Sequence, residues 1–266
     1  MSIDIVSPQN ARVKVWAQLL DRRGRDKQRK FLIEGIHLVE EAVKAQAEVL
    51  TIIYSLDKGK PAELYERTVG YIEWVGVSQA VLEKCSDTQS PQGIIAIVQM
   101  NISPADQILE MAHDLVVVVD GVQDPGNLGT IIRSADAVGA SGVLLGHGTV
   151  DVYNPKTIRS TMGSLFHLPI ISADLLDVLP AARAAGIQLV TTSLQATHSC
   201  YETDLSKPTW FILGNEAKGV SAEVAAEADM KVIIPMQGQA ESLNVAMAAT
   251  VLLFEASRQR AAFTKL

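Results

Sequence analysis

The sequence predicts an α/β fold in two parts: a small α/β domain over residues 1–105 and a larger domain over residues 106–266 with a mostly parallel sheet. Short apolar stretches typical of buried strands alternate with helical stretches through the second part. A polar connection that contains proline, NISPADQILEMAHD, separates the two parts. The chain has 266 residues, of which 48% are hydrophobic and 20% charged, so it is long enough for two globular domains.

The predicted elements follow from the apolar spacing. In the first part, FLIEGIHLVEEAVKA has helical spacing through Leu38, Ala42 and Ala45, and VLTIIYS and GIIAIVQM are predicted strands. In the second part, the predicted strands are LVVVVD, SGVLLG, LPIIS, IQLVTTS, TWFILG and MKVIIPM, with helical stretches such as LLDVLPAARAAG and SAEVAAEA between them. Ligands of such sheets bind in loops beyond the carboxyl ends of the strands. The candidate site is therefore expected in these loops.

Composition limits the location of the protein and its partners. The start of the chain lacks the pattern of a signal peptide, and the longest apolar run, Val245 to Phe254, is shorter than the roughly 20 residues of a membrane span. We therefore expect a soluble cytoplasmic protein with no membrane partner. Cys85 and Cys200 are expected to be free thiols, and no histidine or cysteine spacing predicts a metal site.

Basic residues gather near the N-terminus, although the net charge is -7. The run RRGRDKQRK, from Arg22 to Lys30, holds six of the 23 lysines and arginines, and Arg12 and Lys14 lie nearby. One interpretation is a solvated helix end or linker. The other is a surface that binds RNA phosphates, since each cation that contacts a phosphate releases counterions. Few aromatic residues lie here, so contact with the RNA backbone is favoured over base stacking.

The first loop of interest, DPGNLGTIIRSA, follows the strand LVVVVD. As a simple turn into a helix, it has Pro125 and Gly126 to shape the turn and Asn127 to cap a helix that begins near Leu128. This interpretation leaves Arg133 unexplained, because a guanidinium among apolar helical residues must either extend to solvent or serve a site.

The second loop, GNEAKGVS, is rich in glycine but matches neither common phosphate-binding pattern. It has valine where a P-loop needs lysine, and GxGxxG is absent both here and after the first strand. The absence of GxGxxG disfavours the alternative of a nucleotide-dependent oxidoreductase. The carboxylate of Glu216 favours a ligand with hydroxyl groups or positive charge over a polyphosphate.

The third loop leads from the strand MKVIIPM into a long helix expected to begin near Ser242. Ser242 is the predicted cap, and Leu243, Met247, Val251 and Phe254 form the predicted buried stripe of this helix. Asparagine is a poor helix former, so Asn244 in the first turn indicates a specific role for its amide.

Four stretches together resemble the successive motifs of a known family: DGVQDPGNLGTIIRSADAVGA, VDVYNPKTIRSTMGSLFHLPI, LGNEAKGVS and IPMQGQAESLNVAMAATVLLFEASRQR. The family is SpoU/TrmH, of the SPOUT superfamily of S-adenosylmethionine-dependent RNA methyltransferases, and the resemblance covers nearly all of residues 115–260. In the first part, RKFLIEGIHLVEEAV and SPQGIIAIV resemble the substrate-binding domain of this family.

The resemblance implies methyl transfer to a ribose 2′-hydroxyl in RNA, by a homodimer whose C-terminal domain contains a deep trefoil knot. The cofactor is S-adenosylmethionine, and no metal is needed. The added first domain favours ribosomal RNA over transfer RNA. A second alternative is a noncatalytic protein of the same fold that binds RNA during ribosome assembly. Loss of Arg133, or of the Ser242 and Asn244 pair, would have favoured this alternative.

The resemblance also assigns residues by position. Those implied in catalysis are Asn127, Arg133, Glu216, Ser242 and Asn244, and those implied in cofactor binding are Leu213, Gly214, Asn215, Ile234, Met236 and Leu243. The family arginine is proposed as a general base, but an arginine side chain keeps its proton in proteins. We therefore expect Arg133 to grip the adjacent phosphate and stabilise the developing alkoxide, with Asn127 orienting it.

Overall fold

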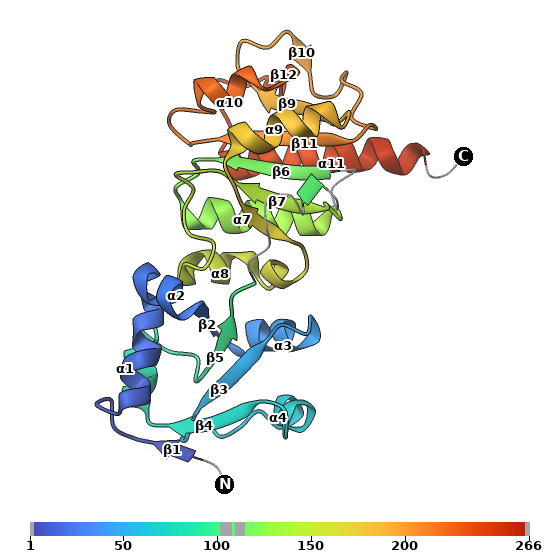
Figure 1. Ribbon diagram of the computed structural model, residues 1–266. Helices are drawn as coiled ribbons and strands as arrows, with labels where there is room; N and C mark the ends of the chain where they lie inside the picture. The colour runs from blue at the N-terminus through green and yellow to red at the C-terminus, as the bar shows by residue number, and fades with distance from the viewer. Residues whose placement is uncertain (1–2, 102–107, 110–114, 264–266) are drawn as a thin grey trace. The chain divides into compact units, whose positions relative to one another are not determined.

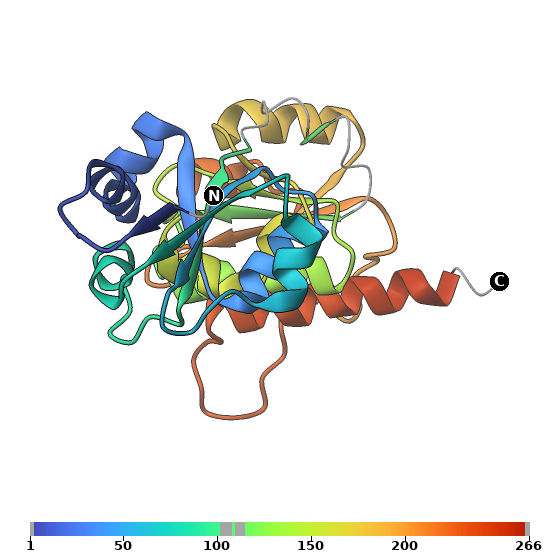
Figure 2. The same ribbon diagram turned by 90° about the horizontal axis from the view of Figure 1, so that it is seen from below.

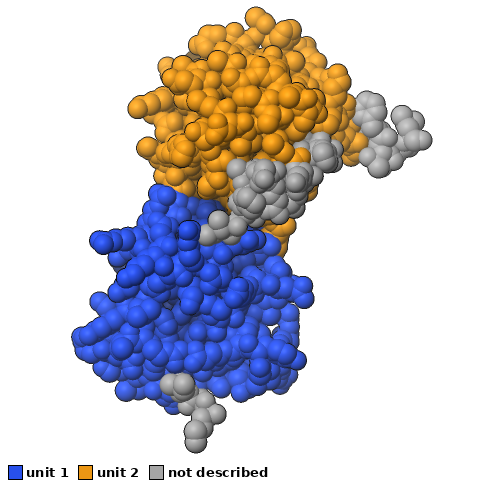
Figure 3. All heavy atoms as spheres, viewed as in Figure 1, with its two compact units in different colours: residues 1–101, 151–166 blue, residues 102–150, 167–266 orange. Residues whose placement is uncertain are grey.

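The computed structural model describes residues 3–101, 108–109 and 115–263, and the chain divides into two compact units. Unit 1 comprises residues 1–101 and 151–166, and unit 2 comprises residues 102–150 and 167–266 (Figure 3). The predicted boundary near residue 105 lies outside the described residues. No helix within the described ranges is long and apolar enough to span a membrane.

Unit 1 contains a five-stranded sheet in the order β1-β4-β3-β5-β2 (Figure 1). Its strands are β1 (Ile3–Ile5), β2 (Lys30–Glu34), β3 (Val49–Ser55), β4 (Glu73–Val77) and β5 (Ile94–Gln99). Its helices are α1 (Ala11–Ala17), η1 (Gln18–Leu20), α2 (Arg22–Gln28), α3 (Ile36–Lys44), α4 (Ala62–Thr68), α5 (Gln79–Cys85), α8 (Pro155–Thr161) and η2 (Ser164–Phe166). β5 runs antiparallel to β2 and β3, whereas β4 is parallel to β1 and β3. The strands predicted at VLTIIYS and GIIAIVQM are confirmed as β3 and β5.

Both faces of the sheet in unit 1 are covered, because successive side chains of a strand point to opposite faces. Leu32 and Ile53 belong to a core with residues of α1 and α5, while Phe31 and Ile52 belong to a second core with residues of α3 and α4. Ile158 of α8 lies in this second core. A helix from the middle of the sequence is thus part of the packing of unit 1.

Unit 2 contains a seven-stranded sheet in the order β10-β12-β9-β11-β6-β7-β8, in which every described pair is parallel. Its strands are β6 (Leu115–Asp120), β7 (Gly142–Leu145), β8 (Ile170–Ser172), β9 (Gln188–Thr192), β10 (His198–Ser199), β11 (Thr209–Gly214) and β12 (Met230–Ile233). Its helices are α7 (Pro125–Ala137), α9 (Leu175–Ala184), α10 (Ala222–Ala226) and α11 (Val245–Phe263). The predicted α/β fold with a mostly parallel sheet is confirmed.

The strands of unit 2 are buried on both faces, as their continuous apolar sequences indicate. Val116 and Val118 share a core with residues of α9 and α10. The alternate residues Val117 and Val119 are also fully buried, and α7 and α11 pack against each other and against β7 and β11, respectively. The connection from β12 to α11 projects as a loop in Figure 2.

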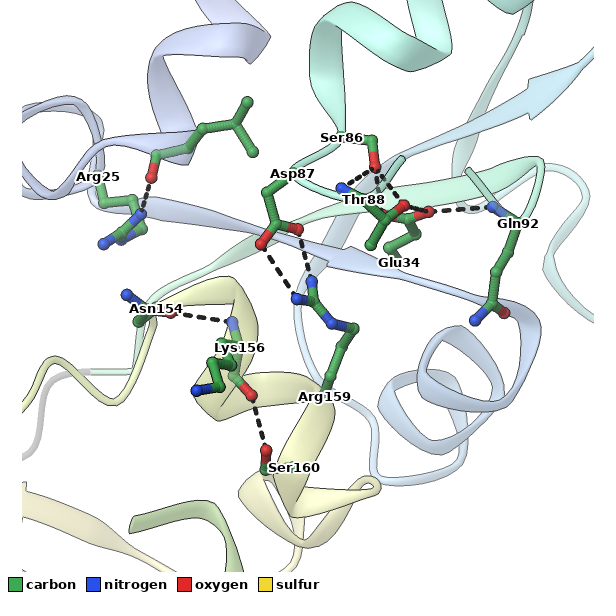
Figure 4. Close-up of polar contacts among 11 residues, drawn as sticks. Arg25, Glu34, Ser86, Asp87, Thr88, Gln92, Asn154, Lys156, Arg159 and Ser160 are labelled. Atoms are coloured by element: carbon green, nitrogen blue, oxygen red, sulfur yellow. Dashed lines mark hydrogen bonds and ion pairs between the residues drawn. The ribbon is translucent and has the colours of Figure 1, made fainter. Parts of the chain in front are cut away.

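Residues 151–166 lie between β7 and β8 in the sequence but belong to unit 1. The ring of Tyr153 lies 4.6 Å from that of Phe31. The guanidinium of Arg159 donates to both carboxylate oxygens of Asp87, at 2.5 and 3.1 Å (Figure 4). The predicted second domain, residues 106–266, includes this segment, so the division in space differs from the predicted division along the chain.

Arg25 departs from the interpretation of RRGRDKQRK as a single charged surface. Its side chain is only 3% exposed and forms an ion pair of 2.6 Å with Asp151, and it donates to the backbone carbonyls of Leu19 and Leu20. Arg22 and Arg23, in contrast, are exposed. Sequence position alone does not separate them, because the partner of Arg25 lies more than a hundred residues away.

We expect Arg25→Ala to lower the free energy of unfolding by about 3–5 kcal/mol, because it leaves the carboxylate of Asp151 poorly solvated and without its partner. Arg23→Ala on the same helix is the matched control and should change stability by less than about 0.5 kcal/mol. Urea denaturation of both variants measures the difference. Equal stability of the two would contradict a structural role for Arg25.

Candidate active site

A cavity of about 650 Å³ lies in unit 2 at the carboxyl ends of β9, β11 and β12. All six residues predicted to bind the cofactor line it, namely Leu213, Gly214, Asn215, Ile234, Met236 and Leu243. Glu216, Ser242 and Asn244 line it as well. These residues come from the second and third loops, so the structure brings those two loops together.

The loop after β9 also lines the cavity, and sequence reasoning missed it. Its lining residues are Ser193, Leu194 and Gln195, which join Thr191 and Thr192 at the end of β9. The sequence pattern of IQLVTTS predicts only a strand. The rule that ligands bind beyond the carboxyl ends of parallel strands would have indicated the residues that follow it.

Arg133 does not line the cavity. It is exposed on α7 between the buried residues Ile132 and Ser134, and no hydrogen bond or ion pair joins it to another described residue. The side chain of Arg133 therefore extends to solvent, and its exposed guanidinium is open to a ligand outside the protein.

The start of α7 differs from the prediction. The helix begins at Pro125, not near Leu128, and its cap is Asp124, whose Oδ1 accepts from the backbone N–H of Asn127 at 2.9 Å. Proline is favourable in the first turn because its missing N–H would have no helical partner there. Asn127 is therefore a residue of the first turn, and its side chain is available for other contacts.

Glu216 accepts three hydrogen bonds from the first loop. Its carboxylate oxygens accept from the backbone N–H groups of Gln123 at 3.2 Å and Asp124 at 3.1 Å, and from Nδ2 of Asn127 at 2.9 Å. Asn127 in turn accepts through Oδ1 from Nδ2 of Asn244 at 3.0 Å. Three residues predicted from separate motifs thus form one hydrogen-bonded chain.

Gly214 is required by the shape of its own loop. Asn215 and Gly219 exchange two backbone hydrogen bonds of 2.9 Å, which turns the loop back on itself. A Cβ on Gly214 would lie 2.1 Å from backbone atoms of Gly219 and Val220. The resemblance implies Gly214 in cofactor binding, and the structure shows in addition that the protein's own backbone lies close to it.

The beginning and the buried face of α11 also differ from the prediction. Oδ1 of Asn244 accepts from the backbone N–H groups of Ala246 and Met247, so Asn244, not Ser242, caps this helix. The predicted buried stripe is largely exposed: the exposed fractions of Leu243, Met247 and Phe254 are 40%, 49% and 51%.

The helix instead buries Ala246, Ala249, Leu252, Leu253 and Ala256. Two apolar stripes run along α11, and the spacing of either one satisfies helical periodicity. The alanines allow close packing against the rest of unit 2, which explains why their stripe is the buried one.

Comparison with known proteins supplies the family. The model of the SpoU rRNA Methylase family matches residues 114–254, and that of the MRM3-like substrate binding domain matches residues 10–96. The chain belongs to the SpoU rRNA methylase family. It is 38% identical to the 23S rRNA (guanosine(2553)-2′-O)-methyltransferase RlmP of Bacillus subtilis, over 94% of this chain and 97% of that protein.

Solved structures of methyltransferases resemble nearly all of the chain. The SpoU methyltransferase AviRb from Streptomyces viridochromogenes, in complex with AdoMet, is 37% identical over 95% of this chain and 99% of that chain, with a TM-score of 0.86. An AdoMet-bound rRNA methyltransferase from Sinorhizobium meliloti is 36% identical over 96% of this chain and 97% of that chain, also with a TM-score of 0.86.

The cavity has the chemistry that a nucleoside cofactor of the SpoU family needs. Its volume lies within the range of small-molecule sites, and Leu213, Ile234 and Leu243 supply aliphatic surface for a flat base. Ser193 and the loop backbone supply polar groups. Among the described residues no cluster of histidine, cysteine or carboxylate side chains is suited to a metal ion.

We expect Gly214→Ala to lower Tm by roughly 5 °C or more, because the new Cβ would displace the backbone at Gly219 and Val220. The same change should reduce the further rise in Tm that S-adenosylmethionine produces in the wild type. Gly238→Ala is the control, since a Cβ there meets nothing within 4 Å. Thermal unfolding with and without cofactor measures both effects, and equal Tm values for the two variants would contradict this explanation of Gly214.

Proposed function

We propose that this protein transfers a methyl group from S-adenosylmethionine to a ribose 2′-hydroxyl of ribosomal RNA. The observation that carries the proposal is the hydrogen-bonded chain from Glu216 through Asn127 to Asn244 beside a cavity of about 650 Å³. It joins three motif loops of the SpoU family at one edge of the sheet.

Ribosomal RNA is favoured over transfer RNA by the extent of the similarity. The relatives named as 23S rRNA methyltransferases match both parts of the chain, over 94% and 96% of its length. A TrmH/SpoU tRNA modifying enzyme from A. aeolicus matches only 57% of this chain, with a TM-score of 0.51. The alternative of a noncatalytic assembly factor is disfavoured because Arg133, Ser242 and Asn244 are all present.

In the proposed mechanism, the bound cofactor supplies a methyl group on a sulfonium, and the protein aligns the 2′-oxygen for in-line displacement. Leu213, Ile234 and Leu243 would hold the base of the cofactor by apolar contact. Arg133 binds the phosphate next to the target ribose and stabilises the negative charge that develops on the 2′-oxygen as its proton passes to solvent water. An exposed guanidinium with no partner among the described residues suits this role.

We expect Arg133→Ala to leave cofactor affinity within a few-fold of the wild type while methyl transfer falls by roughly a hundredfold or more. Arg133→Lys should be nearly as poor, because an ammonium lacks the planar fork of a guanidinium. Single-turnover transfer to ribosomal RNA from pH 7 to roughly 10 tests both variants.

Strong rescue of transfer by lysine as the pH rises would identify a general base at this position and contradict the electrostatic role. Near-normal transfer by Arg133→Ala would contradict both roles. Failure of the wild type to bind S-adenosylmethionine, measured by calorimetry, would contradict the proposed function itself.

We further propose that unit 1 holds the RNA through the exposed cations of its N-terminal helices. Lys14, Arg22, Arg23, Lys27 and Arg29 are all exposed, whereas Arg25 is buried and excluded from this surface. Asp26 lies 3.7 Å from Arg22 and neutralises part of the charge. The match to the MRM3-like substrate binding domain supports this role for residues 10–96.

Replacement of Arg22, Arg23, Lys27 and Arg29 by alanine should weaken RNA binding and flatten its dependence on salt, because fewer counterions are released. Arg25 is left unchanged in this variant, because its replacement is expected to lower the stability of the fold. Affinity for ribosomal RNA fragments is measured across a salt series. An unchanged slope would assign the basic run to an ordinary solvated helix.

We also propose that the protein is a homodimer that pairs through α11, and that unit 2 contains the trefoil knot of the SPOUT superfamily. The exposed stripe of Leu243, Met247 and Phe254 gives a second copy an apolar face to cover, as a two-fold dimer requires. An experimental structure would test the knot by its chain trace. Two buried free cysteines, Cys85 and Cys200, fit the cytoplasm as the proposed location.

Phe254→Glu should convert the dimer to a monomer, because it places a carboxylate within the apolar stripe that the second copy would cover. Tyr71→Glu is the control, since Tyr71 is 90% exposed but lies in unit 1. Light scattering at micromolar concentration with cofactor present distinguishes the two variants. A monomeric wild type under these conditions would remove the dimer proposal.

A further inference from the structure

The N-terminal end of α7 is tied to the loop after β11 by two adjacent side chains. Glu216 accepts from two backbone N–H groups and from the amide of Asn127, as described above. Asn215 donates from Nδ2 to the carbonyl oxygen of Gly121 at 2.9 Å. A carboxylate is favourable at this end of a helix, where the helix dipole is positive. The loop that lines the cavity therefore also holds the start of α7.

The side chain of Asn127 connects this contact to the start of α11. Its Nδ2 faces Glu216 and its Oδ1 faces Asn244. Asn244 uses its own Oδ1 to cap α11, so its Nδ2 is the group left to donate to Asn127. Each amide therefore has one orientation that satisfies both neighbours.

We propose that Glu216 and Asn127 are positioning residues that hold α7, and with it Arg133, against the two loops that line the cavity. Arg133 lies on the same helix as Asn127, so the position of the start of the helix determines the position of the guanidinium. This inference rests on the proposed function of methyl transfer; it extends the orienting role expected of Asn127 and replaces the catalytic role that the resemblance implies for Glu216.

Direct proton transfer by Glu216 does not fit its contacts. Both oxygens of its carboxylate already accept hydrogen bonds from the first loop. Partial burial raises the pKa of Glu216, but the hydrogen bond from Asn127 and those from backbone N–H groups outweigh it, and the net pKa lies below the ordinary value. A general base works best with a pKa near the working pH, so this carboxylate is a weak base.

An exchange of the two side chains tests the proposal. Glu216→Gln alone keeps an oxygen that can accept from Asn127 but turns an NH2 group toward the backbone N–H of Gln123, and Asn127→Asp alone brings two carboxylates together. In the double variant, the new amide at position 216 can donate to the new carboxylate at position 127, which still accepts from Asn244, but the donating NH2 group takes the place of the oxygen that accepted from the backbone N–H of Asp124. The donor and acceptor of the pair are thus reversed, and the pair is kept.

We expect each single variant to lose roughly tenfold or more in single-turnover methyl transfer at saturating cofactor and RNA, while cofactor affinity changes by only a few-fold. The double variant should be clearly more active than the poorer single variant, although it still lacks the acceptor for the backbone N–H of Asp124. Glu223→Gln, a change of an exposed carboxylate on α10 that does not line the cavity, is the matched control and should match the wild type.

A double variant no more active than the poorer single variant would overturn the positioning role, as would normal transfer by Glu216→Gln. Thermal unfolding of the wild type, the two single variants and the double variant measures the coupling between the two positions independently of activity. Additive changes in Tm would also overturn the proposal. A wild type that binds no S-adenosylmethionine would contradict the proposed function and leave the measured coupling to decide whether the two side chains act as a pair.

Discussion

The pairing of β6 with β11 determines where the loops of the candidate active site lie. The two strands run parallel over six residue pairs that end with Gly214 opposite Asp120. Both strands therefore end at the same edge of the sheet, and short side chains can form hydrogen bonds between the loops that follow. Asp120 accepts from the backbone N–H of Ser221 at 2.7 Å, and Asn215 reaches the carbonyl of Gly121. A shift of register by one residue would separate every one of these contacts.

The sheet and its loops could be predicted because their signals are local. LVVVVD and TWFILG are uninterrupted apolar runs that only a doubly covered parallel strand accommodates, and the polar residues directly after them mark the carboxyl edge. The residues that the resemblance implies in cofactor binding lie at the end of β11, in the loops after β11 and β12, or just before α11, and all line the cavity. Position after a strand indicated the loops, and the resemblance to the SpoU/TrmH family singled out the individual residues.

What could not be predicted depends on partners distant in the sequence. Helical spacing in α11 is satisfied by two stripes, and only packing within unit 2 selects the one with Ala246 and Ala249. Asp124 and Asn127 are both good capping residues, and the choice depends on where the proline begins the helix. Arg25 carries the same charge as Arg23, but its ion pair with the distant Asp151 and its bonds to two backbone carbonyls make it structural. For α11 and for Arg25, local chemistry permits two answers and a distant contact selects one, whereas for α7 the neighbouring Pro125 selects the cap.

The packing of residues 151–166 within unit 1 bears on how such enzymes can be rebuilt. A protein engineer who transplanted residues 1–101 onto another methylase would leave Arg25 without Asp151 and Phe31 without Tyr153. The recipient would have to receive the segment between β7 and β8 at the same time. Unit 1 therefore has to be exchanged as two stretches of sequence together. For the same reason, its surface charges cannot be altered in residues 1–101 taken as a separate domain.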